Sequence, residues 1–214
     1  MPTGAGKSLC YQLPALARRS LTLVVSPLIA LMRDQVAQLD ALGISAAALN
    51  SASEPDERRR VFDGLRNRSL RLLYVAPERL LRDDTLDTLR GAVDLLAIDE
   101  AHCVSQWGHD FRPEYLRLRV AAAALGDPQI LAVTATADAP TRADIAKRLF
   151  SRKPRVFVRS FDRPNIFLAM RPKANATRQL TERLDAHPGD SGIVYCASRR
   201  RTEELAREFA ERGR

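Results

Sequence analysis

The stretch Val93-Asp94-Leu95-Leu96-Ala97-Ile98-Asp99-Glu100-Ala101-His102 decides the fold of this 214-residue chain. Its apolar first half predicts a buried strand. A carboxylate at the carboxyl end of such a strand lies where a parallel α/β sheet places its ligand chemistry. Asp99 can bind a magnesium ion there, and Glu100, which points in a different direction, can polarise an attacking water. The competing interpretation is that these two acids only begin a surface helix.

A second signature, Met1-Pro-Thr-Gly-Ala-Gly-Lys-Ser8, opens the sequence and predicts a phosphate-binding loop. A glycine-rich turn points backbone N–H groups at phosphate oxygens, and the helix that follows adds partial positive charge. Lys7 is expected to reach the β and γ phosphates, and Ser8 to be a magnesium ligand. The strict pattern has glycine where this chain has Met1, so a chance turn is the alternative. The expected ATP-binding residues are Thr3, Gly4, Ala5, Gly6, Lys7 and Ser8.

The two segments complete each other chemically. One offers a lysine for the phosphates of ATP, and the other offers carboxylates for Mg²⁺ and for a water molecule. We therefore expect Lys7 and Asp99 to meet around one triphosphate and its cation, with Ser8 and Asp99 as the metal ligands. This combination predicts an ATP-hydrolysing motor.

Short β-branched runs alternate with longer amphipathic stretches along the chain, which is typical of an α/β fold with a parallel sheet flanked by helices. The expected strands cover 21–26, 70–76, 93–99 and 129–134, and the expected helices cover 6–18, 28–42, 53–66, 113–125 and 138–149. The run Ser53-Glu-Pro-Asp56 reads as a capping box with proline in the first turn, so a helix is expected to begin there.

A domain boundary is expected where prolines 164 and 172 interrupt this pattern. The alternation then restarts, with a helix at 177–186, a strand at 191–196 and a helix at 199–212 that Gly213 closes. The predicted organisation is a first domain over 1–159, a linker over 160–173 and a partial second domain over 174–214.

Composition narrows the class of protein only moderately. The net charge of +8 is compatible with nucleic-acid binding, but the charge is spread along the chain and is weak support alone. Cys10, Cys103 and Cys196 are scattered, which argues against a disulfide framework or a zinc knuckle. No apolar run approaches the roughly 20 residues that cross a bilayer. We expect a soluble cytoplasmic monomer without a membrane partner.

Further motifs occur in an order that resembles a superfamily 2 helicase of the RecQ group. The resemblance rests on the phosphate loop, on the DEAH sequence at 99–102, and on segments at 26–35, 74–80, 134–137, 160–165 and 193–196. The aromatic-rich segment at 103–115 is similar to a loop peculiar to RecQ proteins. The resemblance implies a RecA-like motor domain and the truncated start of a second one. It also implies ATP-dependent 3′-to-5′ unwinding, with single-stranded and partially duplex DNA as partners.

The same resemblance assigns coupling roles to residues around the aromatic-rich segment. His102 is expected to sense the γ-phosphate region and to contact Thr134 and Thr136, which otherwise only satisfy a turn. Gln106, Trp107, Phe111 and Arg112 are expected to couple DNA to hydrolysis, with bases stacking on the aromatic rings and phosphate pairing with the arginine. The alternative without a function is a surface loop whose aromatic side chains pack on the core.

Several alternatives stay open. His102, Cys103 and His109 can suggest a metal site, although a fourth ligand is missing. A nucleic-acid-binding module with a vestigial ATPase site and a P-loop transferase of small molecules are the competing functions. The family's upstream adenine-reading segment and its distal arginine motif lie outside this sequence, so the chain alone is expected to bind nucleotide weakly and not to unwind duplexes.

Overall fold

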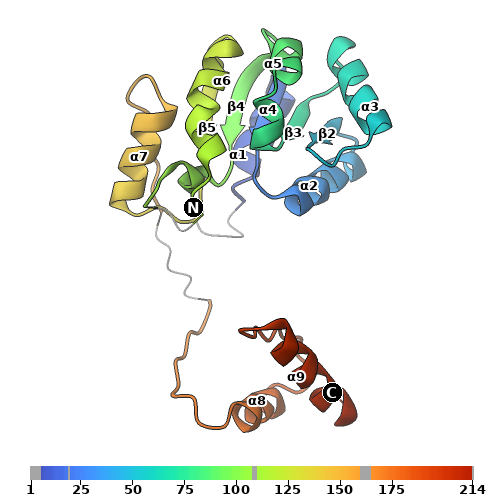
Figure 1. Cartoon of the computed structure of the whole chain (residues 1–214), viewed down its shortest axis with the longest axis vertical. Helices are drawn as coiled ribbons and strands as arrows, with labels where there is room; N and C mark the ends of the chain where they lie inside the picture. The colour runs from blue at the N-terminus through green and yellow to red at the C-terminus, as the bar shows by residue number, and fades with distance from the viewer. Residues whose placement is uncertain (1–5, 19, 108–109, 160–164, 214) are drawn as a thin grey trace. The chain divides into compact units, whose positions relative to one another are not determined.

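The computed structural model describes residues 6–18, 20–107, 110–159 and 165–213 of the chain. The chain divides into two compact units, Met1–Asp162 and Arg163–Arg214. The first unit contains the sheet, and the second contains two of the helices labelled in Figure 1.

Within the described residues, five strands form one parallel sheet in the order β2-β3-β1-β4-β5. The strands are β1 (Leu21–Val25), β2 (Ala46–Leu49), β3 (Leu72–Val75), β4 (Val93–Ile98) and β5 (Gln129–Ala132) (Figure 1). The predicted α/β class is confirmed. From β1 the chain runs to the edge strand β2 and returns through β3, whereas after β4 it continues to β5 on the other side, so the switch point of the topology lies between β1 and β4. Open α/β sheets bind ligands at the carboxyl ends of the strands at such a point.

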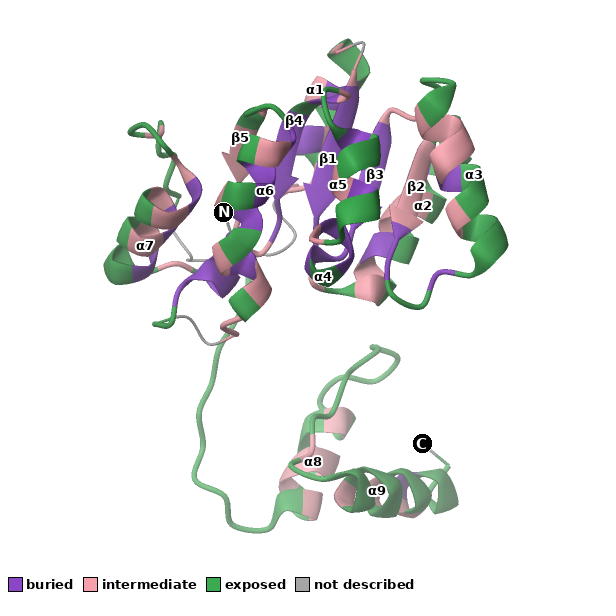
Figure 2. Ribbon diagram, turned by 45° about the horizontal axis from the view of Figure 1, so that its top comes forward, coloured by how far each residue is buried: buried purple, intermediate pink, exposed green. Residues whose placement is uncertain are grey.

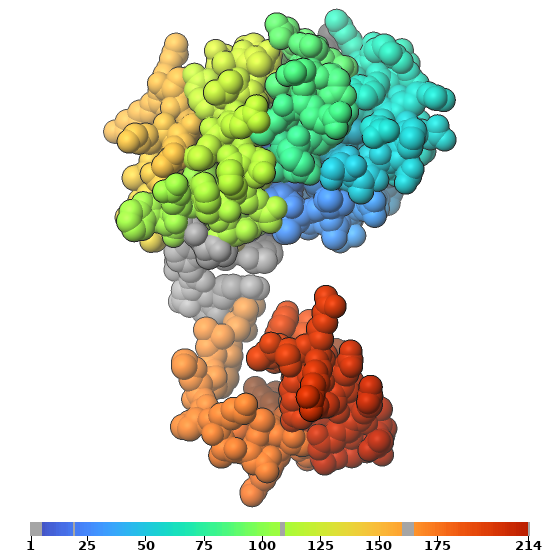
Figure 3. All heavy atoms as spheres, in the orientation of Figure 1, coloured from blue at the N-terminus to red at the C-terminus, as the bar shows by residue number. Residues whose placement is uncertain are grey.

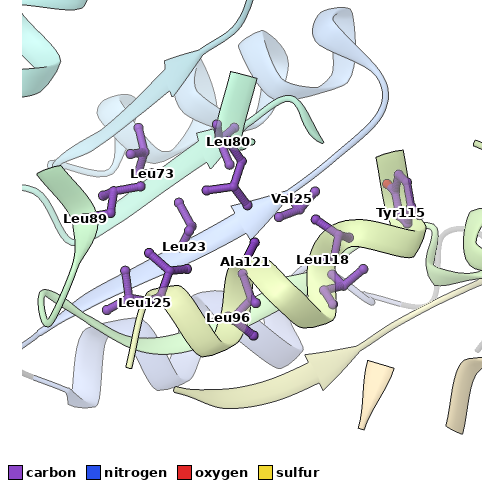
Figure 4. Close-up of a cluster of buried hydrophobic side chains, with 14 of the residues drawn as sticks. Leu23, Val25, Leu73, Leu80, Leu89, Leu96, Tyr115, Leu118, Ala121 and Leu125 are labelled. Atoms are coloured by element: carbon purple, nitrogen blue, oxygen red, sulfur yellow. The ribbon is translucent and has the colours of Figure 1, made fainter. Parts of the chain in front are cut away.

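One face of the sheet carries the larger hydrophobic cluster. Leu23, Val25, Leu73 and Leu96 point from the strands toward the helices that cover this face, as Figure 4 shows. The covering helices are α3 (Pro55–Arg66), α4 (Pro77–Leu80), α5 (Asp83–Leu89), α6 (Leu118–Ala124) and α7 (Ala139–Leu149). In the space-filling view, residues of these helices lie side by side over the front of the unit (Figure 3). Burial of such side chains contributes about 1.5–3 kcal/mol each relative to leaving them exposed.

The opposite face is covered by α1 (Leu9–Ala17) and α2 (Ile29–Ala41). Tyr11 of α1 and Met32 of α2 pack there against Val24 and Tyr74. The alternation follows from the two-residue period of a strand, since residues 23 and 25 of β1 face one layer and residue 24 faces the other. Both faces of the sheet are therefore buried, while the outer faces of the helices stay exposed (Figure 2).

The strand that ends at Asp99 contains a register shift. Leu21 pairs with Val93, but Thr22 pairs with Leu95, so Asp94 is an extra residue in β4. This explains why Val93 and Leu96 belong to the same cluster although they are three residues apart. Asp94 itself is exposed, and its carbonyl oxygen accepts a hydrogen bond from Arg18 Nη1 at 3.4 Å.

Two helix predictions need correction in detail. The cap of α3 is Glu54 rather than Ser53, because the Glu54 N–H donates to the Glu57 carboxylate at 3.1 Å. The Ser53 hydroxyl instead accepts from the Asn50 N–H at 3.1 Å. The helix expected over 113–125 begins as a 3-10 turn, η2 (Pro113–Arg117), and continues as α6.

The second unit contains α8 (Ala176–Asp185) and α9 (Arg199–Glu211), close to the predicted helices. The strand predicted over 191–196 is wrong: these residues have no regular structure among those described, and Ile193 and Tyr195 are 79% and 89% exposed. A strand needs hydrogen-bonded neighbours, and the described part of this unit offers it none. The assignment of this unit to a second RecA-like domain stays a prediction.

A search of the described residues finds no helix that combines the length and the apolar character needed to cross a bilayer.

Candidate nucleotide site and aromatic-rich loop

Three backbone hydrogen bonds tie the strand ends together at the carboxyl edge of the sheet. The Asp99 N–H donates to the Val25 carbonyl at 2.9 Å, and the Val133 N–H donates to the Ile98 carbonyl at 2.9 Å. One residue further on, the Ala101 N–H returns to the Val133 carbonyl at 3.0 Å. The acidic segment is therefore held between the ends of β1 and β5 rather than lying free on the surface.

Asp99 is a buried carboxylate, with 6% of its surface exposed. Burial is the largest cause that raises its pKa above the ordinary aspartate range, and the neighbouring Glu100 raises the pKa further. Hydrogen bonding from the Glu100 N–H, at 2.9 Å from Oδ1, and the charges of Lys7 and His102 lower it. The protein thus offsets only part of the free-energy cost of burying the charged carboxylate. A bound cation would offset the rest.

Lys7 lies close enough to Asp99 for its charge to act on that carboxylate. Gly6 precedes it with a φ of +75°, in the left-handed region that glycine adopts without strain. The Leu9 N–H bonds to the Gly6 carbonyl at 3.0 Å, so the turn leads directly into α1. Gly6, Lys7 and Ser8 are therefore placed at the sheet edge that carries Asp99. Thr3, Gly4 and Ala5, the other expected ATP-binding residues, lie outside the described residues.

Glu100 has an unusual backbone for a residue with a side chain. Its φ and ψ are both 46°, in the left-handed region. This conformation costs roughly 1–2 kcal/mol for a non-glycine residue. It turns the chain directly after the buried strand into the short 3-10 helix η1 (Ala101–Val104). Such strain persists where the surrounding structure enforces it, and it is concentrated at functional sites.

His102 connects Glu100 to the segment after β5. Its Nδ1 atom lies 2.9 Å from the Thr134 hydroxyl and 3.3 Å from Glu100 Oε2. Because a carboxylate only accepts hydrogen bonds, this geometry places a proton on Nδ1. The ring is 4% exposed, so this orientation is fixed by packing.

Thr134 and Thr136 form a small turn behind this histidine. The Thr134 hydroxyl donates to the Thr136 carbonyl at 3.1 Å and accepts from the Thr136 N–H at 3.2 Å. The hydroxyl of Thr134 thus contacts both His102 and the backbone of residue 136. In this turn, the His102 side chain contacts Thr134. Thr136 is linked to the histidine indirectly, through the hydrogen bonds between its backbone and the Thr134 hydroxyl.

Within the aromatic-rich segment at 103–115, Ser105 follows η1 and is fully buried. Its hydroxyl donates to the Asp144 carboxylate of α7 at 2.9 Å and accepts from the Trp107 N–H at 3.2 Å. Gln106 and Trp107 then point outward, and Trp107 is 77% exposed. An exposed indole anchored through its backbone is available for stacking, in line with the expected role.

Arg112 has internal partners that the sequence did not indicate. Its guanidinium donates from Nε and Nη2 to Asp110 Oδ2 at 3.3 and 3.2 Å, and from Nη1 to the Pro27 carbonyl at 3.3 Å. Phe111 beside it is half-buried. The arginine therefore connects the loop to the segment after β1, and a phosphate contact would have to compete with Asp110.

The sequence matches one family of known proteins over most of its length. The model of the DEAD/DEAH box helicases matches residues 1–145. The chain belongs to this family. Its sequence is similar to that of RecQ proteins. It is 47% identical over all 214 residues to the ATP-dependent DNA helicase RecQ of Haemophilus influenzae and 42% identical over 207 residues to that of Bacillus subtilis.

These relatives are considerably longer than the chain. It covers 35% of each of the two bacterial proteins, and 34% of the ATP-dependent DNA helicase Q1 of Mus musculus, to which it is 40% identical. The chain thus spans about a third of the length of the curated relatives it matches.

Solved helicase structures share the fold of this DEAD/DEAH box chain. The structure of the DUF1998 helicase MrfA aligns with 99% of this chain, and the aligned part is 35% of the MrfA chain. The TM-score is 0.69 and the sequence identity is 22%. A hypothetical ATP-dependent RNA helicase from Sulfolobus tokodaii covers 71% of the chain, and the chain covers 44% of it, at a TM-score of 0.53 and 21% identity. At this level of identity the likeness concerns the RecA-like fold alone.

The helicase chain also brings His102, Cys103 and Asp110 together, with candidate ligand atoms within 4.8 Å of one another. Burial, and next to it the charge of Asp110, raise the pKa of the Cys103 thiol to about 12. The thiol keeps its proton and donates it to Asp110 at 3.7 Å, while Arg112 pairs with the same carboxylate. The Asp110 carboxylate is thus already engaged by the thiol and by the guanidinium. His109, the remaining candidate from the sequence, lies outside the described residues.

Two buried tyrosines of this site escaped the sequence analysis. Tyr115 is fully buried and donates its hydroxyl proton to the Asp99 carbonyl at 3.0 Å. Tyr11, three residues after Ser8, is 1% exposed and lies near Asp99. The sequence shows them only as aromatic residues at helical positions, and their contacts depend on the tertiary fold.

Proposed function

We propose that this chain is the ATP-hydrolysing part of a RecQ-type DNA helicase that moves 3′-to-5′ on single-stranded DNA and opens duplexes. The observation that carries the proposal is that the charge of Lys7 acts on the buried carboxylate of Asp99 at the switch point of the sheet. A cation suited to phosphate and a carboxylate suited to a metal ion therefore share one edge of the sheet, which supports phosphoryl transfer from ATP.

The proposed roles follow from the chemistry of each group. Lys7 stabilises charge on the transferring phosphate, and Gly6 with Thr3, Gly4 and Ala5 surrounds the phosphates with backbone N–H groups. Ser8 and Asp99 hold Mg²⁺, and Glu100 accepts a proton from the attacking water.

The donor set fits Mg²⁺. Asp99 and Ser8 both offer oxygen, which is the ligand that this hard cation prefers. The Ser8 hydroxyl forms no cap hydrogen bond with helix α1, although serine at this position ordinarily does. The Asp99 carboxylate is disfavoured by burial. A bound Mg²⁺ supplies positive charge for the phosphates and for these two ligands.

DNA is proposed to act on hydrolysis through the aromatic-rich segment at 103–115. Trp107 offers a stacking surface, while His102 and Thr134 connect the other end of the segment to Glu100. Single-stranded and partially duplex DNA are the proposed partners, in keeping with the names of the relatives.

The test is ATP hydrolysis by the full-length protein, with and without single-stranded DNA. Lys7→Ala and Glu100→Gln should each reduce the DNA-stimulated rate by about 100-fold or more, because they remove phosphate stabilisation and the base. Matched controls are Lys147→Ala on α7 and Glu203→Gln on α9, which are exposed and should keep the rate.

Retention of the stimulated rate by both site variants would refute the assignment. Hydrolysis that is indifferent to DNA would favour a small-molecule transferase. DNA binding without phosphate release in the unmodified protein would favour a binding module with a vestigial ATPase site.

A further inference from the structure

Asp144 of α7 contacts the aromatic-rich segment and has no part in the proposed chemistry. The Ser105 hydroxyl donates to Asp144 Oδ2 at 2.9 Å. The oxygen of the same hydroxyl accepts from the Trp107 N–H at 3.2 Å. A chain of two hydrogen bonds therefore runs from α7 to the backbone of the residue that carries the exposed indole.

The direction of these two hydrogen bonds is fixed by their partners. A carboxylate can only accept a hydrogen bond, and a backbone N–H can only donate one. The Ser105 hydroxyl therefore points its proton at Asp144 and presents a lone pair to the Trp107 N–H. Because Ser105 is fully buried, no water replaces Asp144 as the acceptor unless the surrounding structure rearranges.

The backbone of Ser105 is tied to the nucleotide site on its other side. Its N–H donates to the His102 carbonyl at 3.0 Å, and His102 Nδ1 lies 2.9 Å from the Thr134 hydroxyl. Thr134 and Asp144 belong to one stretch of chain, which runs from the end of β5 into α7. Two side-chain contacts thus join that stretch to residues 102–107, one near the proposed base and one next to the indole.

Packing holds α7 in the place that this arrangement requires. The 3-10 helix η1 packs against α7, and Val104 and Ile145 are buried members of the same hydrophobic cluster. The side chain of Asp144, which neighbours Ile145, is 20% exposed. Arg148 Nε lies 3.7 Å from Asp144 Oδ2, which is too long for a hydrogen bond, so the Ser105 hydroxyl is the closer partner.

We propose that Asp144 is a positioning residue for DNA sensing: its carboxylate orients the Ser105 hydroxyl, which holds the backbone of Trp107 so that the indole is already presented when DNA arrives. The inference rests on the proposed function and deepens it, because it assigns part of the regulation of hydrolysis by DNA to a contact with α7. Ordering the segment in advance raises the fraction of molecules that are competent to bind, and the apparent affinity for DNA rises with that fraction.

The test is ATP hydrolysis by full-length Asp144→Ala, measured without DNA and over a range of single-stranded DNA concentrations. Loss of one ordering hydrogen bond should raise the DNA concentration for half-maximal stimulation about 5- to 10-fold. Hydrolysis without DNA should not change. Asp144→Asn keeps an oxygen acceptor for Ser105 and should restore most of the sensitivity to DNA. The matched control is Asp40→Ala, which makes the same change at an exposed position of α2 and should alter neither value.

Three further variants separate this role from the stability of α7. Arg148→Gln removes the ion pair with Asp144 but keeps the acceptor for Ser105, so the DNA requirement should not change. In a Trp107→Ala background, Asp144→Ala should add little, because the proposed role acts through the indole. Ser105→Ala removes the hydroxyl itself and should raise the DNA requirement to a similar extent, which tests the inference even if Asp144→Ala folds poorly.

An unchanged DNA requirement in both Asp144→Ala and Ser105→Ala overturns the inference. So does an equal loss of hydrolysis with and without DNA, an effect of Arg148→Gln as large as that of Asp144→Ala, or full additivity with Trp107→Ala. Failure of the proposed function has a different signature, because the unmodified protein would then hydrolyse ATP at a rate that DNA does not change.

Discussion

The Nδ1 atom of His102 lies 2.9 Å from the Thr134 hydroxyl, and this contact joins the segment after β4 to the segment after β5. The same nitrogen lies 3.3 Å from Glu100. One imidazole N–H therefore contacts both the proposed base and a threonine turn. A change in the charge or position of Glu100 alters the hydrogen bond available to Thr134, so the two segments are coupled through a single proton.

Thr134→Val should test that coupling. The substitution keeps the volume but removes the hydroxyl, which leaves His102 with Glu100 as its remaining Nδ1 partner in this contact. We expect DNA-stimulated ATP hydrolysis to fall about tenfold, the equivalent of one hydrogen bond in the transition state, with a small change in KM for ATP. Steady-state hydrolysis with saturating single-stranded DNA measures this. Thr134→Ser retains the hydroxyl and should keep most of the rate; equal losses in both variants would contradict the coupling.

The sequence was sufficient to predict the strand β4 and the carboxylates at its end because both signals are local. An apolar run followed by Asp99 and Glu100 needs no tertiary information to predict a strand end with ligands. The contact between His102 and Thr134 came from the family resemblance, since residues 32 positions apart meet only through the pairing of β4 with β5.

The sequence failed where tertiary context overrides local preference. The strand β2 was missed because Ala46-Ala47-Ala48 has low β propensity, and its pairing with β3 supplies the stability. The run at 191–196 has the composition of a strand but no described neighbour to pair with. The internal partners of Arg112 could not be predicted, because a sequence cannot show that Asp110 and the Pro27 carbonyl are within reach. Its contact with phosphate stays a prediction.

Asp99→Asn should stabilise the fold and abolish hydrolysis. Burial raises the pKa of Asp99, so the ionised carboxylate is less favourable in the folded state than in the unfolded state. The amide can still accept the Glu100 N–H bond without carrying a charge. We expect the melting temperature at pH 7 to rise by about 2–4 °C in the absence of Mg²⁺, roughly 1 kcal/mol. A lower melting temperature in Asp99→Asn would show that Lys7 and His102 outweigh the burial.

The pH dependence of that difference has a definite sign. A carboxyl whose folded pKa is raised contributes stability that is present below its unfolded pKa, about 3.9, and is lost as the pH rises through the folded value. The stability advantage of Asp99→Asn over the unmodified protein should therefore be absent in acid and grow toward neutral pH. Chemical denaturation at a series of pH values measures it, and an advantage that is constant with pH would argue against this origin.

Trp107→Ala should separate DNA sensing from folding. The indole is 77% exposed, so its removal should change the free energy of unfolding by less than about 0.5 kcal/mol. A lost base stack costs about 1–3 kcal/mol, so DNA stimulation should need about 5- to 150-fold more DNA, while hydrolysis without DNA stays the same. Titration of single-stranded DNA into the hydrolysis reaction gives both values. Equal loss of basal and stimulated rates would indicate damage to the site itself.

For the ion pair between Arg79 and Asp84, we expect the opposite dependence of stability on pH: its contribution is lost in acid. Arg79 is 5% exposed and donates to both Asp84 oxygens, at 3.1 and 2.9 Å, which lowers the pKa of Asp84. Asp84→Ala leaves a buried guanidinium without this partner, and because Asp84 itself is half-exposed and screened we expect a loss of about 1 kcal/mol at pH 7. Stability from a lowered pKa is present above the unfolded value and lost as the pH falls through the folded one. The difference between Asp84→Ala and the unmodified protein should thus shrink below about pH 4. Arg79→Met combined with Asp84→Ala should recover stability; a double variant weaker than Asp84→Ala would mean that Arg79 stabilises through other contacts.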